Sequence, residues 1–266
     1  MTVPQYLRAF IGIQKRELLR FVQQRERFFA ALVRPLVWLV VFATGFRAAL
    51  GVSIIPPYTT YITYDTYIVP GLIGMVQLFN GMQSSLSMVY DREMGSMRVL
   101  LTSPMPRWFL LLCKVAAGTT VSILQAYAFL AIAAAFGIRM PALGYLTVLP
   151  ALILSGLMLG AFGLMLSSWI RQLENFAGVM NFVIFPTFFL SSALYPLWKM
   201  LESSRVIHAI CVANPFTYAV ELIRFSLYLQ LNLTAAAIVV AALAVFSLLA
   251  VLGYDPRHGL VRRQTV

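Results

Sequence analysis

The chain has 266 residues, of which 61% are hydrophobic and only 11% are charged. A soluble globular protein carries about 25% charged residues, so this composition excludes a protein whose whole surface faces water. The net charge of +11 does not indicate a nucleic-acid-binding protein. The charges cluster in short segments between long apolar runs, as they do in the cytoplasmic loops of membrane proteins.

Residues 1–27 precede the first long apolar run and predict an amphipathic helix. At 100° per residue, leucine, isoleucine and phenylalanine side chains gather on one face and arginines on the other. Two interpretations fit this pattern. The helix lies at the membrane surface, or it packs on the protein's own loops.

Six apolar runs follow, and each is long enough to cross a bilayer, whose hydrocarbon core needs about 20 helical residues. We expect an all-α membrane protein with transmembrane helices at about 28–50, 66–90, 108–138, 143–169, 176–194 and 233–254. Residues 28–266 therefore form one six-helix transmembrane domain. Arg34 and Arg47 are expected near the ends of the first span, where their side chains can extend to the headgroups.

The distribution of Lys and Arg predicts the orientation of these spans. Of the 20 Lys and Arg residues, 15 fall on the side that holds both termini and 5 fall on the other. Cytoplasmic loops carry the excess of positive charge. We therefore expect a multi-pass protein of the inner (cytoplasmic) membrane, in contact with lipid, with both termini in the cytoplasm.

Polar side chains recur every three to four residues in the second span, from Gly74 to Ser87. Because polar groups are costly in lipid, this stripe faces other helices or water. It either lines a translocation path or holds helices together. In the fifth span, amides lie among phenylalanines, which suits a large amphiphilic cargo better than a bare ion. The predicted path comprises Gln77, Asn80, Ser84, Asn181, Phe185 and Phe188.

The linker between the second and third spans, DREMGSMRVLLTSPMPR, is too long for a simple turn between helices. It mixes charged and apolar residues and stops at two prolines, which predicts a short amphipathic helix. Its apolar face would fit a groove on a partner protein or lie on the membrane surface, and the composition does not choose between the two.

Residues 195–230 predict an outer segment with two short helical stretches. Asn214 is a candidate N-cap with Pro215 in the first turn of the second stretch, and Glu221 and Arg224 can pair three residues apart. Non-helical backbone at membrane depth must be buried in protein or line a cavity. We therefore expect a re-entrant helical hairpin that caps the outer end of the path, with a structured extracellular loop as the alternative.

Two repeats of a single residue type indicate how the helices are anchored at the interface and how closely they pack. Tyrosines recur every third residue before the second span, at Tyr58, Tyr61, Tyr64 and Tyr67. This spacing is typical of an anchoring belt at the outer interface, with stacking against sugar rings as the alternative. Small residues in the fourth span, Gly156, Gly160 and Gly163, would let a neighbouring helix approach closely.

Several kinds of chemistry have no motif in the sequence. There is no phosphate-binding loop of the G-x-x-x-x-G-K-[ST] type, and no carboxylate is expected in the middle of a span, where coupled carriers commonly need one. His208 and His258 are isolated and indicate no metal site. We expect no catalytic residues, and the chain is not an enzyme by itself.

Two runs resemble those of a known family. Residues 90–114, YDREMGSMRVLLTSPMPRWFLLLCK, are similar to the region between the second and third spans of ABC-2 type permeases. Residues 185–224 resemble the fifth span and outer hairpin of the same family. The two motifs occur in the expected order, and the similarity extends over essentially the whole chain.

The resemblance implies a dimer of two such chains with two separate cytoplasmic ATPase subunits, which hold ATP and Mg, so that this chain itself has no cofactor. It identifies the helix of the 91–107 linker as the coupling helix that docks on the ATPase, with the N-terminal helix leaning on the same partner. The implied coupling residues are Asp91, Arg92, Glu93, Gly95, Ser96, Met97, Arg98 and Leu101. The implied outer-gate residues are Pro196, Asn214, Pro215, Tyr218, Glu221 and Arg224.

Family members export lipid-linked polysaccharides, drugs and other amphiphiles, so the resemblance implies an exporter permease. Many relatives have a small residue and a proline where this chain has Ser192 and Leu201–Glu202, which puts the shape of the outer hairpin in doubt. Two alternatives belong to other classes. A membrane anchor or scaffold would bind no ATPase, and a secondary carrier would follow an ion gradient without one.

Overall fold

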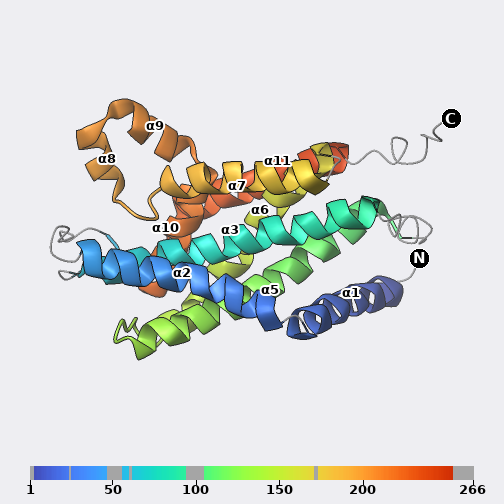
Figure 1. Ribbon diagram of the computed structural model, residues 1–266, viewed down its shortest axis with the longest axis horizontal. Coiled ribbons are helices and arrows are strands. Elements are labelled where there is room, and N and C mark those ends of the chain that lie inside the picture. The colour runs from blue at the N-terminus through green and yellow to red at the C-terminus, as the bar shows by residue number, and fades with distance from the viewer. Residues whose placement is uncertain are drawn as a thin grey trace.

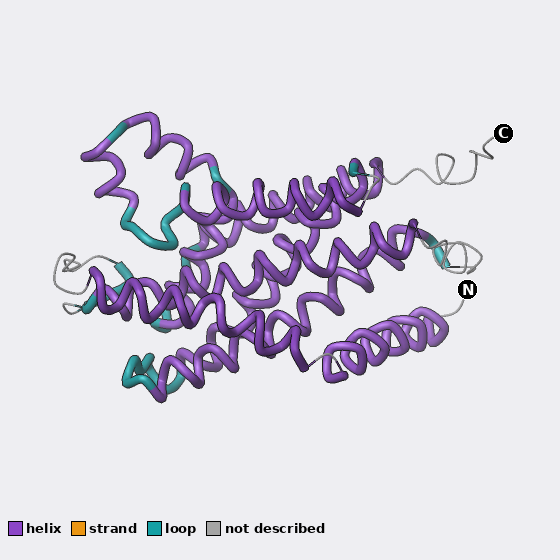
Figure 2. Tube along the Cα trace, in the orientation of Figure 1, coloured by secondary structure: helices purple, strands orange, loops and turns teal. Residues whose placement is uncertain are grey.

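The structure is a computed structural model that describes residues 3–23, 25–46, 56–59, 62–93, 105–170 and 173–253. Ten α-helices make up the architecture of these ranges, which confirms the all-α prediction (Figure 2). They are α1 (Val3–Gln23), α2 (Arg25–Phe46), α3 (Tyr64–Glu93), α5 (Arg107–Ala135), α6 (Gly144–Trp169), α7 (Leu173–Phe189), α8 (Leu197–Ser203), α9 (Arg205–Ala213), α10 (Pro215–Leu227) and α11 (Leu233–Gly253).

The long helices form one bundle with a common axis, and α6 is its centre (Figure 1). Helix α6 packs against α11, α3, α5 and α10. The short helices α8 and α9 project from one end of the bundle, and α1 lies alongside the opposite end. The outer segment therefore contains three helices, α8, α9 and α10, where the sequence predicts two.

Three helices are long and apolar enough to cross a membrane, namely α5, α6 and α11, within the residues that the structure describes. A fourth span results if α9 and α10, which are bent by 74° with respect to each other, form one broken span. Helices α2 and α7 contain shorter apolar stretches, Leu32–Val41 and Gly178–Phe189. Each predicted span overlaps a helix, but α7 ends at Phe189, five residues before the predicted end of the fifth span, because the chain turns at residues 190–195. The number six stays a prediction.

The predicted third span is too long by three residues, because α5 ends at Ala135. Gly137 adopts φ +88°, a left-handed conformation that glycine takes without steric cost. The Gly137 amide then donates to the Ala134 carbonyl at 3.1 Å and the Ile138 amide to the Ala133 carbonyl at 3.0 Å. These two bonds satisfy the last carbonyls of the helix and stop it.

Small residues bring α3 and α6 into close contact, as predicted for the glycines of the fourth span. A Cβ atom on Gly163 would lie 2.8 Å from the Gly81 carbonyl oxygen, and one on Gly81 would lie 2.8 Å from the Leu159 carbonyl oxygen. Gly156 and Gly160 face Thr119 and Val115 of α5 in the same way. In lipid, such close backbone approach replaces the hydrophobic effect as the source of helix association.

The prediction of a tyrosine belt at the membrane interface is wrong for the three tyrosines that the structure describes. Tyr58, Tyr64 and Tyr67 are 4%, 1% and 1% exposed, and Tyr61 lies outside the described residues. The Tyr64 hydroxyl donates to the Leu194 carbonyl at 3.0 Å and the Tyr67 hydroxyl to the Ser192 carbonyl at 3.1 Å. The outer segment covers this end of α3, so these tyrosines join protein to protein.

Helix α1 runs alongside the first half of α5. The Tyr6 ring packs edge-on against Phe109, with centroids 4.9 Å apart, and the Thr120 hydroxyl donates to the Gln14 side chain at 3.3 Å. The helix therefore packs on a candidate membrane span rather than on loops.

Candidate functional site

The predicted coupling and gate segments lie toward opposite ends of α3. Asp91, Arg92 and Glu93 are the last three residues of that helix. The other predicted coupling residues, Gly95, Ser96, Met97, Arg98 and Leu101, lie outside the described residues. The first residue of α3 is Tyr64, at the end from which α8 and α9 project (Figure 1). One helix thus connects the two candidate sites.

Helix α1 has three faces rather than the predicted two. One face is half-buried against the bundle and carries Tyr6, Phe10, Ile13 and Phe21. A second face leaves apolar side chains exposed, namely Leu7, Ile11, Leu18 and Val22. A third face is exposed and basic, with Arg8, Lys15, Arg16 and Arg20. The helix can therefore contact the bundle, an apolar phase and an acidic surface at the same time.

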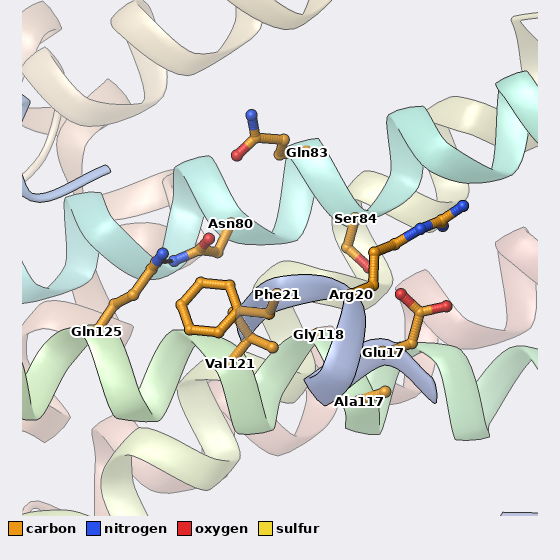
Figure 3. A pocket seen from close by; sticks show the side chains of 10 residues that line it. All are labelled: Glu17, Arg20, Phe21, Asn80, Gln83, Ser84, Ala117, Gly118, Val121 and Gln125. Atoms are coloured by element: carbon orange, nitrogen blue, oxygen red, sulfur yellow. Dashed lines mark hydrogen bonds between the residues drawn. The ribbon is translucent and has the colours of Figure 1, made fainter. Parts of the chain in front are cut away.

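An open recess with about 590 Å³ of empty space lies between α1, α3 and α5 (Figure 3). Its lining mixes polar and apolar side chains and includes Glu17 and Arg20 from α1, Asn80 and Ser84 from α3, and Gln125 from α5. Gly118 lets α5 pass close to Ser84 of α3, because a Cβ atom at this position would lie 2.8 Å from the Ser84 hydroxyl oxygen. Two of the predicted path residues, Asn80 and Ser84, therefore line a cavity within one protomer.

Amide side chains of α3 bind the neighbouring helices. The Gln77 amide donates to the Leu152 carbonyl at 2.8 Å and accepts from the Ser155 hydroxyl at 2.6 Å. The Asn80 amide donates to Gln125 of α5. Gln77 is 1% exposed, so within one protomer it holds α3 against α6. Whether the stripe also borders a path in the assembled transporter stays a prediction.

An aromatic face extends over α2, α3 and α7. The Phe79 ring packs edge-on against Phe185, with centroids 6.3 Å apart, and Phe185 stacks on Phe189 at 6.3 Å. Of the predicted path residues on α7, Asn181 and Phe185 are exposed, whereas Phe188 is buried. Phe182 beside them is 79% exposed. The face therefore presents rings and one amide to whatever lies outside the protomer.

Arg34 corrects an expectation about the first span. Its guanidinium lies 3.9 Å from the centroid of the Phe79 ring, and Phe79 is at the middle of the 30-residue helix α3. Arg34 is the tenth residue of α2, so its side chain stacks on a ring level with the middle of α3 and not at a helix end, and it is exposed on the surface of the protomer. A cation over a ring face is stabilised by the quadrupole of the ring, which replaces part of the lost hydration.

Asn214 holds the outer segment to the end of α7. Its side-chain oxygen accepts from the Phe216 amide at 3.0 Å, which confirms the predicted N-cap with Pro215 as the first residue of α10. Its amide also donates to the Thr187 and Leu190 carbonyls, both at 2.7 Å. One side chain therefore starts α10 and satisfies two carbonyls at the end of α7.

Arg224 is the most deeply buried charge of the outer segment, at 2% exposed. It pairs with Glu221, as predicted, donates to the Ser192 carbonyl at 2.8 Å, and stacks on the Tyr67 ring with 4.2 Å to its centroid. A buried charge needs both a counter-ion and hydrogen bonds, and α10, α3 and the turn after α7 contribute to them together.

Tyr58 completes this cluster from the segment before α3. Its ring packs edge-on against Tyr228, with centroids 4.7 Å apart. Burial raises the pKa of the Tyr58 hydroxyl above its ordinary value of about 10, so the phenol is neutral at physiological pH. The two remaining predicted gate residues are Pro196, which is buried directly before α8, and Tyr218, which is half-buried in α10.

Two of these side chains, Gln125 and Phe79, were given no role from the sequence. Gln125 carried a usable signal, because Thr119, Ser122 and Gln125 form a polar stripe in the third span that matches the stripe of the second. Phe79 carried none, and Tyr67 was predicted as part of an interface belt and not as the partner of a cation. Their partners, Arg34 and Arg224, come from distant segments, and only the tertiary structure brings a cation over each ring.

Comparison with known proteins finds one family. Residues 8–228 match the family described as ABC-2 type transporter. The chain is 29% identical over 199 residues to a putative transport permease, ycf38, of Porphyra purpurea, a match that covers 74% of this chain and 66% of that relative. It is 32% identical over 146 residues to the probable multidrug ABC transporter permease YbhR of Escherichia coli K12, covering 54% and 39% of the two chains.

Proposed function

Since this chain belongs to the ABC-2 type transporter family, whose permease subunits work with an ATPase subunit, we propose that it exports an amphiphilic cargo across the inner membrane. It is a multi-pass membrane protein and an ABC transporter permease, so the prediction that it is not itself an ATPase is confirmed. Permeases of this family typically bind no cofactor themselves. The cargo and the direction of transport are part of the proposal.

The continuity of α3 is the observation that carries the mechanism. The helix has 30 residues and is therefore about 45 Å long. Its last residues begin the segment that we propose to dock on the ATPase. Its first turn is bonded, through the Tyr64 and Tyr67 hydroxyls, to the Leu194 and Ser192 carbonyls of the turn that leads from α7 into the outer segment. A movement of the inner end of α3 is then transmitted to the outer gate by one rigid element.

A path for an amphiphile needs a surface that is apolar but not uniform. The aromatic face of α2, α3 and α7 fits this need, because exposed rings of Phe182 and Phe185 lie beside the exposed amide of Asn181. We place the path between this face and the same face of a second copy. A dimer with its axis along the membrane normal would bring the two faces together.

The basic face of α1 supports a contact with the ATPase or with anionic headgroups. Four cationic side chains are exposed along it, and the adjacent apolar face can lie in the acyl region. We propose that α1 leans on the ATPase at the inner end of the bundle. Six spans with both termini in the cytoplasm, and two ATPase copies per permease dimer, complete this arrangement.

Co-purification of the permease with its ATPase subunit tests the proposal. We expect the Arg92→Ala/Glu93→Ala variant to lose most of the bound ATPase, because these two residues belong to the segment that we propose to dock on it. The control is Arg139→Ala, an exposed residue of the turn between α5 and α6, which should retain the ATPase. Inverted vesicles that hold the complex should then accumulate cargo only with ATP.

The two alternatives make different predictions in the same experiment. A scaffold would bind no ATPase before or after mutation. A secondary carrier would move cargo in the absence of ATP, driven by an ion gradient. If the double variant retains as much ATPase as the control does, the proposed role of the 91–107 linker in docking the ATPase is wrong.

A further inference from the structure

Arg34 is a cation level with the middle of α3, and it has no counter-ion among the residues that the structure describes. Its guanidinium stacks on Phe79, at the middle of α3, and it makes no ion pair within the described part of the chain. Ionisable groups inside a membrane are costly and normally serve a pathway or a ligand. The side chain is also exposed on the aromatic face of the protomer, so it is open to a ligand from outside.

A second copy of the chain cannot neutralise Arg34. Rotation about an axis along the membrane normal keeps every residue at its own depth, so the acids of a partner copy lie where those of this copy lie. The chain has nine Asp and Glu residues. In α2 itself, Glu26 is about 12 Å below Arg34 along the helix, given a rise of 1.5 Å per residue.

The remaining acids are further from this depth or already engaged. Asp65 and Asp91 lie near the ends of α3, each about 20 Å from Phe79. Glu174 is about 16 Å from Phe185 along α7. Glu17 lines the recess with Asn80, but it is paired with Arg16, and Glu221 is paired with Arg224. Glu93 is the last residue of α3, Glu202 lies in α8, and Asp255 lies outside the described residues. No acid of the described helices is placed to pair with Arg34, so we look for its counter-charge outside the protomer.

We propose that Arg34 binds the anionic group of the exported amphiphile, with Phe79 and Phe185 as the platform for its apolar part. The proposal rests on the function proposed above and narrows its cargo to amphiphiles that carry a phosphate or carboxylate. The planar guanidinium stacks on a ring with one face and keeps its N–H groups free at the edge. Those N–H groups match the geometry of phosphate and carboxylate oxygens.

Trp38 provides a local probe of this site. It lies one turn after Arg34 in α2 and packs edge-on against Phe189, with centroids 5.6 Å apart. The other three tryptophans, Trp108, Trp169 and Trp198, are exposed elsewhere and can be replaced by phenylalanine. In the resulting full-length chain, in phosphatidylcholine nanodiscs, quenching by a bromine-labelled ligand reports occupancy beside Arg34.

The experiment compares two probes with the same chain, 12-bromododecyl phosphate and the uncharged 12-bromododecyl maltoside. We expect Arg34→Gln to raise the half-quenching concentration of the phosphate about tenfold, the loss of one charge-assisted contact, and to leave that of the maltoside unchanged. Arg34→Lys should fall in between, because it keeps the charge but not the planar stack. Arg139→Gln, on the exposed turn, is the matched control.

Two outcomes overturn the proposal. Equal effects of Arg34→Gln on both probes, or no effect on either, would show a structural role only. The second outcome concerns whether the anion bound at Arg34 is cargo in the path or a lipid of the bilayer. In the complex with the ATPase, MgATP and vanadate should release the phosphate probe if it occupies the path. Unchanged occupancy, with equal quenching by brominated phosphatidylglycerol, would assign Arg34 to a bilayer lipid.

Failure here and failure of the proposed function are distinguishable. The quenching assay in its first form uses the permease chain alone, so it is independent of ATPase docking. The co-purification assay uses variants of the inner end of α3, which leave Arg34 unchanged.

Discussion

Arg224 and Glu221 illustrate how single residues stabilise the outer segment. Removing both charges from water costs several kcal/mol per ion. The ion pair, the Ser192 carbonyl and the face of Tyr67 offset this cost. Because the partners come from α10, α3 and the turn after α7, the cluster fixes three segments relative to one another. A substitution that removes only the Glu221 charge leaves the Arg224 charge buried without a counter-ion.

We therefore expect Glu221→Gln to lower the free energy of unfolding by about 3–5 kcal/mol, the usual cost of orphaning one member of a buried pair. The double variant Glu221→Met/Arg224→Met should be less destabilised, because it buries no charge. Glu202→Gln on exposed α8 is the control. Thermal unfolding in mild detergent measures all three, and a double variant less stable than the single one would contradict the argument.

Asn214 makes a second prediction at this scale. Asn214→Ala loses the helix cap and leaves the Thr187 and Leu190 carbonyls without their donor. Asn214→Ser keeps a good cap but cannot reach both carbonyls. We expect the alanine variant to be less stable than the serine variant by about 1 kcal/mol, the usual value of a cap. Equal unfolding temperatures would show that the cap contributes nothing here.

At the scale of elements, the crossing of α3 and α6 depends on residues without side chains. Gly81 and Gly163 lie where the two backbones approach most closely, and each faces a carbonyl of the other helix. Lipid provides no hydrophobic force between helices, so contact distance and dispersion decide the association. A single methyl group at this crossing must move one backbone.

We expect Gly81→Ala to destabilise the fold by about 1–3 kcal/mol, the usual cost of overpacking. Gly178 in α7 is the matched control, because a Cβ atom there meets nothing within 4 Å. Gly178→Ala should be neutral or stabilising by up to about 1 kcal/mol, since alanine is the better helix former. Unfolding in detergent measures both. Similar losses for the two variants would mean that helix propensity, and not the crossing, decides.

At the scale of the whole molecule, α1 and the end of α3 that leads to the coupling segment lie toward one end, and α8 and α9 lie toward the other (Figure 1). From the lysine and arginine bias we expect the first end to face the cytoplasm. This arrangement places the proposed ATPase contact and the proposed gate on opposite sides of the membrane.

Labelling of single cysteines in intact cells tests this orientation. The two native cysteines, Cys113 and Cys211, are free and buried and can be replaced first. We expect a membrane-impermeant maleimide to label Ser203→Cys from outside, and Lys15→Cys only after the cells are broken. Lys15 lies in α1 and Ser203 is the last residue of α8, and these two helices lie at opposite ends of the bundle (Figure 1). Labelling of both from the same side would rule out the proposed topology.

The helices themselves were largely predictable, because apolar runs bounded by Pro, Gly and charge leave few choices for the backbone. The cap at Asn214, the Glu221–Arg224 pair and the close approach at Gly163 were predicted for the same reason, since each depends on neighbours in sequence or on side-chain size alone. The boundaries were less accurate at the end of α5, where the left-handed Gly137 was not recognised.

Composition, apolar periodicity and local spacing determined that this chain is a helical membrane protein, and two motifs indicated its family. Only the tertiary structure decided that Tyr64 and Tyr67 join protein to protein, that Gln77 binds α6, and that Arg34 lies over Phe79. A sequence pattern gives the face on which a side chain lies. Its partner is chosen by which helices pack together, and that choice depends on contacts between residues far apart in the chain.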